Sequence, residues 1–209
     1  LIVVCSPNNP TGSLLKQNDL KELVAVVKEY GLTVISDEIY NRLVYDKGSF
    51  RSLGTFAEIR DQLILVNGFS KTYAMTGVRL GYLVGPADIV KELGKMQGLS
   101  NVCISPSVQR AGIAALTGPQ DCVDAMVEAY DRRRRLLVKE LNSIAGFSCE
   151  MPGGAFYAFP KVEKLRSSLE FCDRLLRERQ VITVPGSAFG AGGEGYLRIS
   201  YATSDEIIK

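Results

Sequence analysis

One lysine, Lys71, stands shortly after the apolar run Leu63 to Val66, and the arginine Arg79 follows it along the chain. A lysine held at the end of a buried strand can lose its proton and attack an aldehyde. The guanidinium group of an arginine can bind a phosphate. This pair therefore predicts a pocket for a phosphorylated aldehyde, and pyridoxal phosphate (PLP) is the cofactor with that chemistry.

The charge of the chain is close to balanced, with 25 Lys and Arg residues against 23 Asp and Glu residues among 209. A formal net charge of +2 gives no electrostatic reason to expect a nucleic-acid partner. The longest apolar runs are far too short to span a bilayer, so no membrane partner is expected either. The predicted partners are small molecules.

The chain contains no histidine. This absence removes Ser-His-Asp and Cys-His catalysis and the usual zinc sites, so no metal is expected and any general base is Lys, Asp, Glu, Tyr or Cys. The cysteines show no CxxC spacing, which predicts reduced, mostly buried thiols in a cytoplasmic protein instead of a disulfide framework. They are Cys5, Cys103, Cys122, Cys149 and Cys172.

Both ends of the chain predict a piece of a longer protein. The sequence begins within an apolar segment without an initiator Met, and Ser204 to Lys209 is typical of the cap and first turn of a helix. A removed targeting sequence is therefore left open.

Apolar strand-like segments alternate with helical patterns in the first part of the chain. This alternation predicts an α/β layer with a largely parallel sheet, in which ligands bind where the strands end. The expected strands are 1–5, 32–36, 63–66 and 79–84, and the expected helices are 18–30, 87–99 and 105–116.

A second, small α+β domain is expected after residue 120, so that the domains are 1–120 and 121–209. It begins with a long helix over 121–144, and the run Arg132 to Arg135 is predicted to be solvated helix surface. The other expected elements are strands around a turn within 147–160, a helix over 167–179, and strands at 181–184 and 196–201.

Four motifs follow one another in the sequence: Asn8 to Gly12, Asp37 to Tyr40, Ser70-Lys71 with Arg79, and Tyr196 to Ser200. Over almost the whole chain this order resembles the class I/II aminotransferases of PLP fold type I, in the aspartate-aminotransferase-like subgroup. The resemblance implies the C-terminal part of the large PLP-binding domain, followed by a small domain that is incomplete at its end. Family members are much longer, and their N-terminal half brings a phosphate-binding loop, an aromatic ring stacked on PLP and dimer contacts.

The resemblance also implies roles for residues around the cofactor. Lys71 would bond the PLP aldehyde and move the substrate proton, and Asp37 would keep the pyridine nitrogen protonated. Tyr40 and Asn9 would both donate to the phenolic oxygen, with Asn9 placed by a cis bond to Pro10. From the residues alone, Asp37 could equally be a helix cap and Asn9 part of a simple turn.

Three further residues complete the implied site. Arg79 would bind the phosphate, and Ser70 would supply part of the role of a hydroxyl residue that the family often has at the position of Gly68. Arg198 would hold the substrate α-carboxylate through a bidentate contact, although a plain exposed strand arginine is the alternative. The loop Gly186 to Gly190 is either a segment that closes over substrate or an ordinary loop.

The implied function is an aminotransferase of the EC 2.6.1 type, which exchanges an amino group between an amino acid and a 2-keto acid. The family also implies a homodimer, and the missing half implies that this part alone is inactive. Two alternatives remain: a PLP-dependent C-S β-lyase on the same fold, and a non-catalytic ligand-sensing domain of a transcription regulator. The sequence does not select the amino acid.

Overall fold

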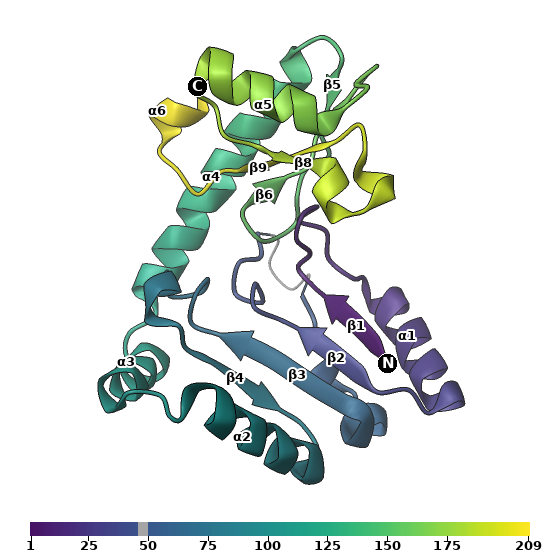
Figure 1. Ribbon diagram of the computed structural model, residues 1–209, viewed down its shortest axis with the longest axis vertical. Helices are drawn as coiled ribbons and strands as arrows, with labels where there is room; N and C mark the ends of the chain where they lie inside the picture. Colours follow the sequence, from purple (N-terminus) through teal and green to yellow (C-terminus); the bar gives the residue numbers. More distant parts are fainter. Residues whose placement is uncertain (46–49) are drawn as a thin grey trace. The chain divides into compact units, whose positions relative to one another are not determined.

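The computed structural model describes residues 1–45 and 50–209, which form two compact units (Figure 1). The first unit comprises Leu1–Pro7 and Leu14–Asp124, and the second comprises Asn8–Ser13 and Ala125–Lys209. The segment Asn8–Ser13 thus belongs to the second unit although its neighbours in the chain belong to the first. The domain boundary expected after residue 120 stays a prediction.

A four-stranded sheet organises the first unit, in the order β1 (Ile2–Cys5), β2 (Val34–Asp37), β3 (Leu63–Gly68) and β4 (Gly81–Val84). The first three strands are parallel to one another, and β4 is antiparallel to β3 (Figure 1). This mostly parallel sheet, with helices around it, confirms the predicted α/β class.

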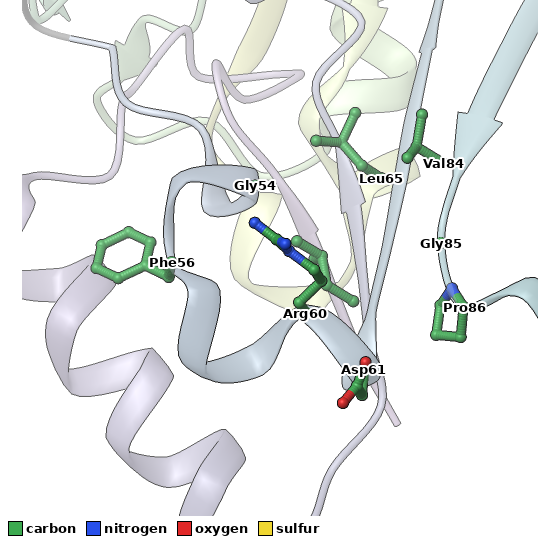
Figure 2. Close-up of a pocket in the computed structure, with 9 residues that line it drawn as sticks. Gly54, Phe56, Arg60, Asp61, Leu65, Val84, Gly85 and Pro86 are labelled. Atoms are coloured by element: carbon green, nitrogen blue, oxygen red, sulfur yellow. The ribbon is translucent and has the colours of Figure 1, made fainter.

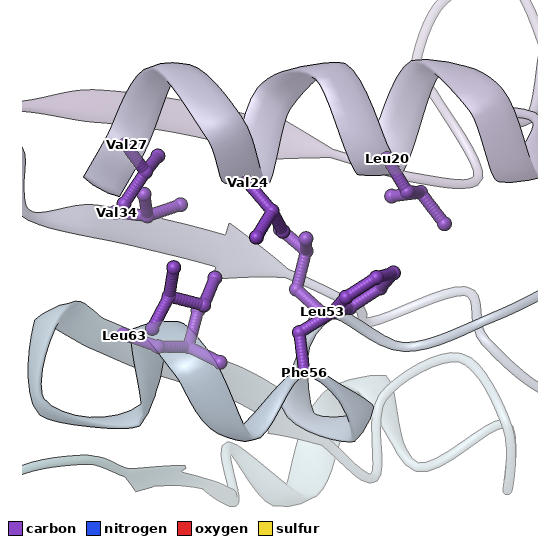
Figure 3. Packing of buried hydrophobic residues seen from close by; sticks show 8 residues of the cluster. Leu20, Val24, Val27, Val34, Leu53, Phe56 and Leu63 are labelled. Carbon is purple, nitrogen blue, oxygen red and sulfur yellow. The ribbon is translucent and has the colours of Figure 1, made fainter. Parts of the chain in front are cut away.

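The helix α1 (Gln17–Tyr30) covers one face of this sheet, and its buried side chains explain why it forms where the sequence predicts it. Leu20, Val24 and Val27 recur at helical spacing and pack into a core beside β2 and β3 (Figure 3). Burial of each such side chain contributes about 1.5–3 kcal/mol to the free energy of folding. This packing holds in place the strands whose ends carry the predicted site residues. The other buried members of this core are Val34, Leu53, Phe56, Ile59 and Leu63.

The rest of the first unit consists of short 3-10 turns and two helices: η1 (Leu53–Thr55), η2 (Ala57–Gln62), η3 (Thr76–Val78), α2 (Ala87–Asn101) and α3 (Pro106–Thr117). All four residues of β4 are exposed, and α2 contributes no buried residue. Both helices nevertheless follow the ranges that the sequence predicts.

The second unit combines the long helix α4, apart from its first four residues, with short strands and one further long helix. The elements are α4 (Asp121–Ser143), β5 (Phe147–Ser148), β6 (Tyr157–Ala158), β7 (Lys161–Val162), α5 (Ser168–Arg179), β8 (Val184–Pro185), η4 (Gly186–Phe189), η5 (Ala191–Gly193), β9 (Leu197–Ser200) and α6 (Asp205–Ile208). Their strands form a pair, β5 with β7, and a triplet in the order β6-β9-β8.

Two strand predictions in this unit need correction. The strands expected around a turn within 147–160 do not pair with each other, because β5 pairs with β7 and β6 pairs with β9. The strand expected at 181–184 is observed only as β8, which begins at Val184, the last residue of the expected range. Both differences arise from pairing with distant segments, which local patterns do not encode.

The prediction that the arginine run is solvated helix surface is wrong for Arg134. Its side chain is only 2% exposed, bonds Asp131, and donates from Nη1 to the carbonyl oxygen of Pro152. Arg132 and Arg133 each place Nε 2.9 Å from a carboxylate oxygen of Asp205 on α6. Burial therefore depends on which neighbour each position of α4 faces.

Asp205 in turn is held charged by these two arginines. Their hydrogen bonds lower the pKa of Asp205 to about 2, while its limited desolvation acts in the opposite sense. The contact ties the short helix α6 to α4 within the second unit.

The prediction of mostly buried thiols is also wrong. All five cysteines are free, Cys149 and Cys172 are buried, but Cys103 and Cys122 are exposed. Cys103 lies between α2 and α3, and Cys122 lies in the first turn of α4. None of the helices in the described part of the chain has both the length and the hydropathy of a membrane-spanning segment.

We predict that Arg134→Ala lowers the free energy of unfolding by about 3 kcal/mol, because it removes a buried cation that bonds both Asp131 and a backbone carbonyl. Arg135→Ala is the matched control, since Arg135 bonds the same Asp131 from a side chain that is 61% exposed. Its expected cost is below about 1 kcal/mol. Urea denaturation measures the free energy of unfolding of both variants. Equal losses of stability would contradict the role of Arg134 as a buried, bonded cation.

Candidate active site

The register of the first unit's sheet brings the turn after β2 and the connection between β3 and β4 to one edge. Asp37 at the end of β2 pairs with Val66 near the end of β3, so these parallel strands finish together. Gly81 at the start of β4 pairs with Gly68 at the end of β3, because β4 runs the other way. The residues that follow β2, follow β3 and precede β4 therefore meet at the same edge of the sheet.

The motif Asp37 to Tyr40 forms a tight turn at this edge. The Asp37 carboxylate is half-buried, and its Oδ1 accepts a hydrogen bond from the Ile39 N–H at 3.1 Å. The backbone N–H of Asn41 donates to the Glu38 carbonyl at 2.9 Å, which closes the turn. Tyr40 is buried. The turn thus holds a carboxylate and a phenol in a fixed local geometry.

Glu38 is a buried acid within this motif that sequence reasoning did not single out. Its side chain is 3% exposed, and Oε1 accepts hydrogen bonds from Ser52 Oγ at 2.8 Å, Ser36 Oγ at 3.1 Å and the Leu53 N–H at 3.1 Å. Burial raises the pKa of Glu38, and these hydrogen bonds offset only part of the effect. The side chain ties η1 to the end of β2. The position of Glu38 directly after Asp37, at the end of a predicted buried strand, is the sequence signal that could have identified it.

Lys71 lies in the turn that follows β3 and is half-buried. The turn is closed by hydrogen bonds from Tyr73 N and Met75 N to the Phe69 carbonyl, at 3.2 and 3.3 Å. The Phe69 ring is buried and stacks on Tyr73 with centroids 5.8 Å apart. A Cβ at Gly112 would lie within 3.3 Å of the Phe69 ring, so the glycine lets α3 approach this turn closely.

The segment between Gly68 and Arg79 explains one departure from the family's usual pattern. A Cβ at Gly68 would lie 3.1 Å from the Leu80 carbonyl oxygen and 3.2 Å from Ile39 Cδ1, which leaves little room for a side chain. Ser70, beside the lysine, is half-buried. Arg79 is exposed, has a φ of 56°, and donates from Nη1 to the Thr76 carbonyl at 3.3 Å.

Asn9 and Arg198 lie in the second unit and contact each other. Arg198 Nη1 donates to Asn9 Oδ1 at 2.9 Å, a contact that links two residues for which the sequence predicts separate roles. The Asn9-Pro10 bond is cis, as the resemblance predicted. The Gly12 carbonyl accepts hydrogen bonds from two backbone N–H groups, which ties this segment to the turn at 153–154.

Burial alternates in part along the segment 196–201, where the sequence predicts a strand. Leu197 and Tyr201 are buried, whereas Arg198 is half-buried and Ser200 is exposed, as a strand with one apolar face requires. Ile199 departs from the pattern because it is only half-buried. The polar face of β9 therefore carries Arg198.

Two cavities border the sheet of the first unit. One, of about 650 Å³, is lined by Asn67, Arg79, Tyr82 and residues of α2, and its size suits a small ligand. The other, of about 300 Å³, lies at the opposite edge of the sheet and is lined by Arg60 and Asp61 among others (Figure 2). None of the predicted site residues lines the second cavity.

The chemistry of the residues at the site edge fits PLP. An amine, a carboxylate, a phenol and a guanidinium match an aldehyde, a pyridine nitrogen, a phenolic oxygen and a phosphate. The first unit supplies Asp37, Tyr40, Ser70, Lys71 and Arg79. Within 1–45 and 50–209, no group of three or more His, Cys, Asp or Glu side chains could hold a metal ion.

Comparison with known proteins gives consistent matches. Residues 1–209 match the protein family described as Aminotransferase class I and II. The aspartate aminotransferase of Pyrococcus abyssi is 43% identical over 208 residues, which cover 98% of this chain and 53% of that protein. The aromatic-amino-acid aminotransferase 2 of Thermococcus litoralis is 41% identical over 208 residues, with the same two coverages of 98% and 53%.

Solved structures share the fold. An aromatic aminotransferase from Pyrococcus horikoshii OT3 aligns with a TM-score of 0.94 at 42% identity, over 99% of this chain and 56% of that chain. The aspartate aminotransferase from Rhizobium meliloti aligns with a TM-score of 0.93 at 35% identity, over 99% and 54%. These matches confirm the predicted PLP fold type I. The chain spans about half the length of the curated relatives it matches.

We predict that Glu38→Gln changes how stability depends on pH. Because folding raises the pKa of Glu38 above its ordinary value of 4.5, its protonated form is favoured in the folded protein. Its contribution to stability is complete below that value and is lost as the pH rises through the folded-state pKa. Urea denaturation at pH values between about 4 and 8 measures this loss.

Glutamine keeps an oxygen acceptor for Ser36, Ser52 and Leu53 but does not titrate. The free energy of unfolding of the original protein should therefore fall relative to that of the variant as the pH rises. A difference between the two that stays constant across this range would contradict the assignment of a raised pKa.

Proposed function

Because this chain belongs to the class I and II aminotransferases, we propose that the protein transfers an amino group between an amino acid and a 2-keto acid with PLP as cofactor. The observation that carries the proposal is the sheet register, which brings the Asp37 turn, the Lys71 turn and Arg79 to one edge. When bound, PLP supplies an electron sink that makes removal of the substrate's Cα proton less costly.

The residues of the first unit are proposed to bind and polarise the cofactor. Lys71 would provide the amine that bonds the aldehyde, and its Nζ, once the substrate amine has displaced it, would move the proton at the substrate Cα. The Asp37 carboxylate holds the proton on the pyridine nitrogen, and the Tyr40 hydroxyl donates to the phenolic oxygen. Arg79 and the Ser70 hydroxyl bind the phosphate.

The residues of the second unit are proposed to serve the substrate and the phenolic oxygen. Arg198 binds the α-carboxylate of the amino acid through two N–H donors. Asn9 accepts from Arg198 with Oδ1, so its amide N–H₂ remains to donate to the phenolic oxygen. One contact therefore joins the group that binds substrate to a group that binds cofactor.

We further propose that activity requires a chain of the relatives' full length, assembled as a homodimer. The described residues leave many large apolar side chains exposed on β4, α2 and α3, and a soluble enzyme normally covers such a surface. They are Leu83, Val84, Val90, Met96, Leu99, Ile113 and Leu116. Residues that the relatives have beyond this region are the proposed cover.

In a chain of full length, we predict that Lys71→Ala lowers transamination by at least about 10⁴-fold, because no other proposed group supplies the attacking amine. Circular dichroism should show that the fold is retained. Lys28→Ala, in the last turn of α1, is the matched control and should leave the rate unchanged.

The assay follows formation of a new amino acid from a 2-keto acid across a panel of amino donors. Full activity of the Lys71→Ala variant would overturn the proposal. Release of a keto acid and ammonia without formation of a new amino acid would indicate the β-lyase alternative instead.

A further inference from the structure

The guanidinium group of Arg198 lies among aromatic rings of the second unit. Its Cζ is 4.6 Å from the centroid of the Tyr157 ring and 5.1 Å from the centroid of the Phe189 ring. The third contact is the hydrogen bond from Nη1 to Asn9 Oδ1. The contacts come from three different segments, β6, η4 and the turn after β1, so they restrain the side chain from several directions.

The Phe189 ring is itself supported. It stands edge-on to the Phe159 ring, with centroids 6.1 Å apart and an interplanar angle of 88°. Phe159 in turn stacks on Tyr196 at 5.0 Å and 6°. Phe189 is therefore held over Arg198 by a chain of ring contacts that returns to the segment just before β9.

These contacts have a consequence for binding. An arginine side chain has about 2 kcal/mol of rotamer entropy, which it loses when it binds a carboxylate in a fixed orientation. Rings that already hold the guanidinium reduce the part of that cost that falls on binding. The bond to Asn9 uses Nη1, and a two-point carboxylate contact needs only two further N–H donors.

We infer that Tyr157 and Phe189 are positioning residues, which hold Arg198 in the orientation that binds the α-carboxylate of the substrate. This inference rests on the proposed function, because it assumes that Arg198 is the carboxylate-binding group. Phe189 is the better residue to test, since it is 37% exposed whereas Tyr157 is only 7% exposed. Its replacement disturbs the core least.

The test follows the Nε–Hε resonance of Arg198 by NMR, in this chain without cofactor, during titration with propionate as a simple carboxylate. The Arg198→Lys variant assigns the resonance. We expect Phe189→Leu to weaken propionate binding by about fivefold, as loss of about 1 kcal/mol of cation–π interaction implies. Phe189→Tyr, which keeps the ring, should restore binding.

Ile182→Ala is the control, because Ile182 is an apolar residue of the same unit that is 80% exposed, and it should bind propionate unchanged. In a chain of full length, Phe189→Leu should raise the KM for the amino acid by a similar factor and leave kcat unchanged. If Phe189 had only a structural role, its replacement would not change KM while leaving kcat unchanged, and tyrosine would not restore binding.

The possible failures are distinguishable. Propionate binding by Arg198→Lys, which lacks this resonance, is followed through the backbone amide resonances of the same protein. If that binding is unchanged, the proposed carboxylate role of Arg198 is wrong and the inference falls with it. If Arg198→Lys weakens binding but Phe189→Leu binds like the original protein, the positioning role alone is overturned. Weak binding by both Phe189→Leu and Phe189→Tyr would also overturn it, because the ring itself would then not be the cause.

Discussion

The arrangement of the candidate site depends on the pairing of β3 with its two neighbours in opposite senses. Parallel pairing with β2 aligns the ends of both strands, and antiparallel pairing with β4 brings the start of β4 to the same edge. Backbone hydrogen bonds thus place the turn after β2 beside the connection between β3 and β4, which lies about 30 residues further along the chain. The reactive groups at this edge of the sheet are therefore set by the residues that follow β2 and β3 in the sequence.

The buried side chain of Glu38 stabilises this edge of the sheet. It bonds two serines and a backbone N–H, and so links the turn after β2 to η1, which packs in the same core as α1. Burying a carboxyl group is unfavourable unless its acceptors are satisfied, and three donors meet that need here. The position of the neighbouring Asp37 therefore depends on groups outside the motif itself.

Much of this could be predicted from the sequence, because periodicity and short motifs are local properties. The ranges of α2, α3 and β3 follow from local sequence patterns, and the motif order identified the family. Long-range effects could not be read in this way. The pairing of β5 with β7, the burial of Arg134 and the contact between Asn9 and Arg198 each join residues far apart in the chain. No local pattern distinguishes Arg134 from Arg135.

The most direct test of the central claim is to incubate a chain of full length with PLP, reduce it with borohydride, and map the modified lysine by peptide mass spectrometry. The account predicts one pyridoxyl group, on Lys71, because Lys71 follows β3 at the edge where Asp37 and Arg79 also lie. A pyridoxyl group on another lysine, or labelling scattered over several lysines of a folded protein, would contradict it.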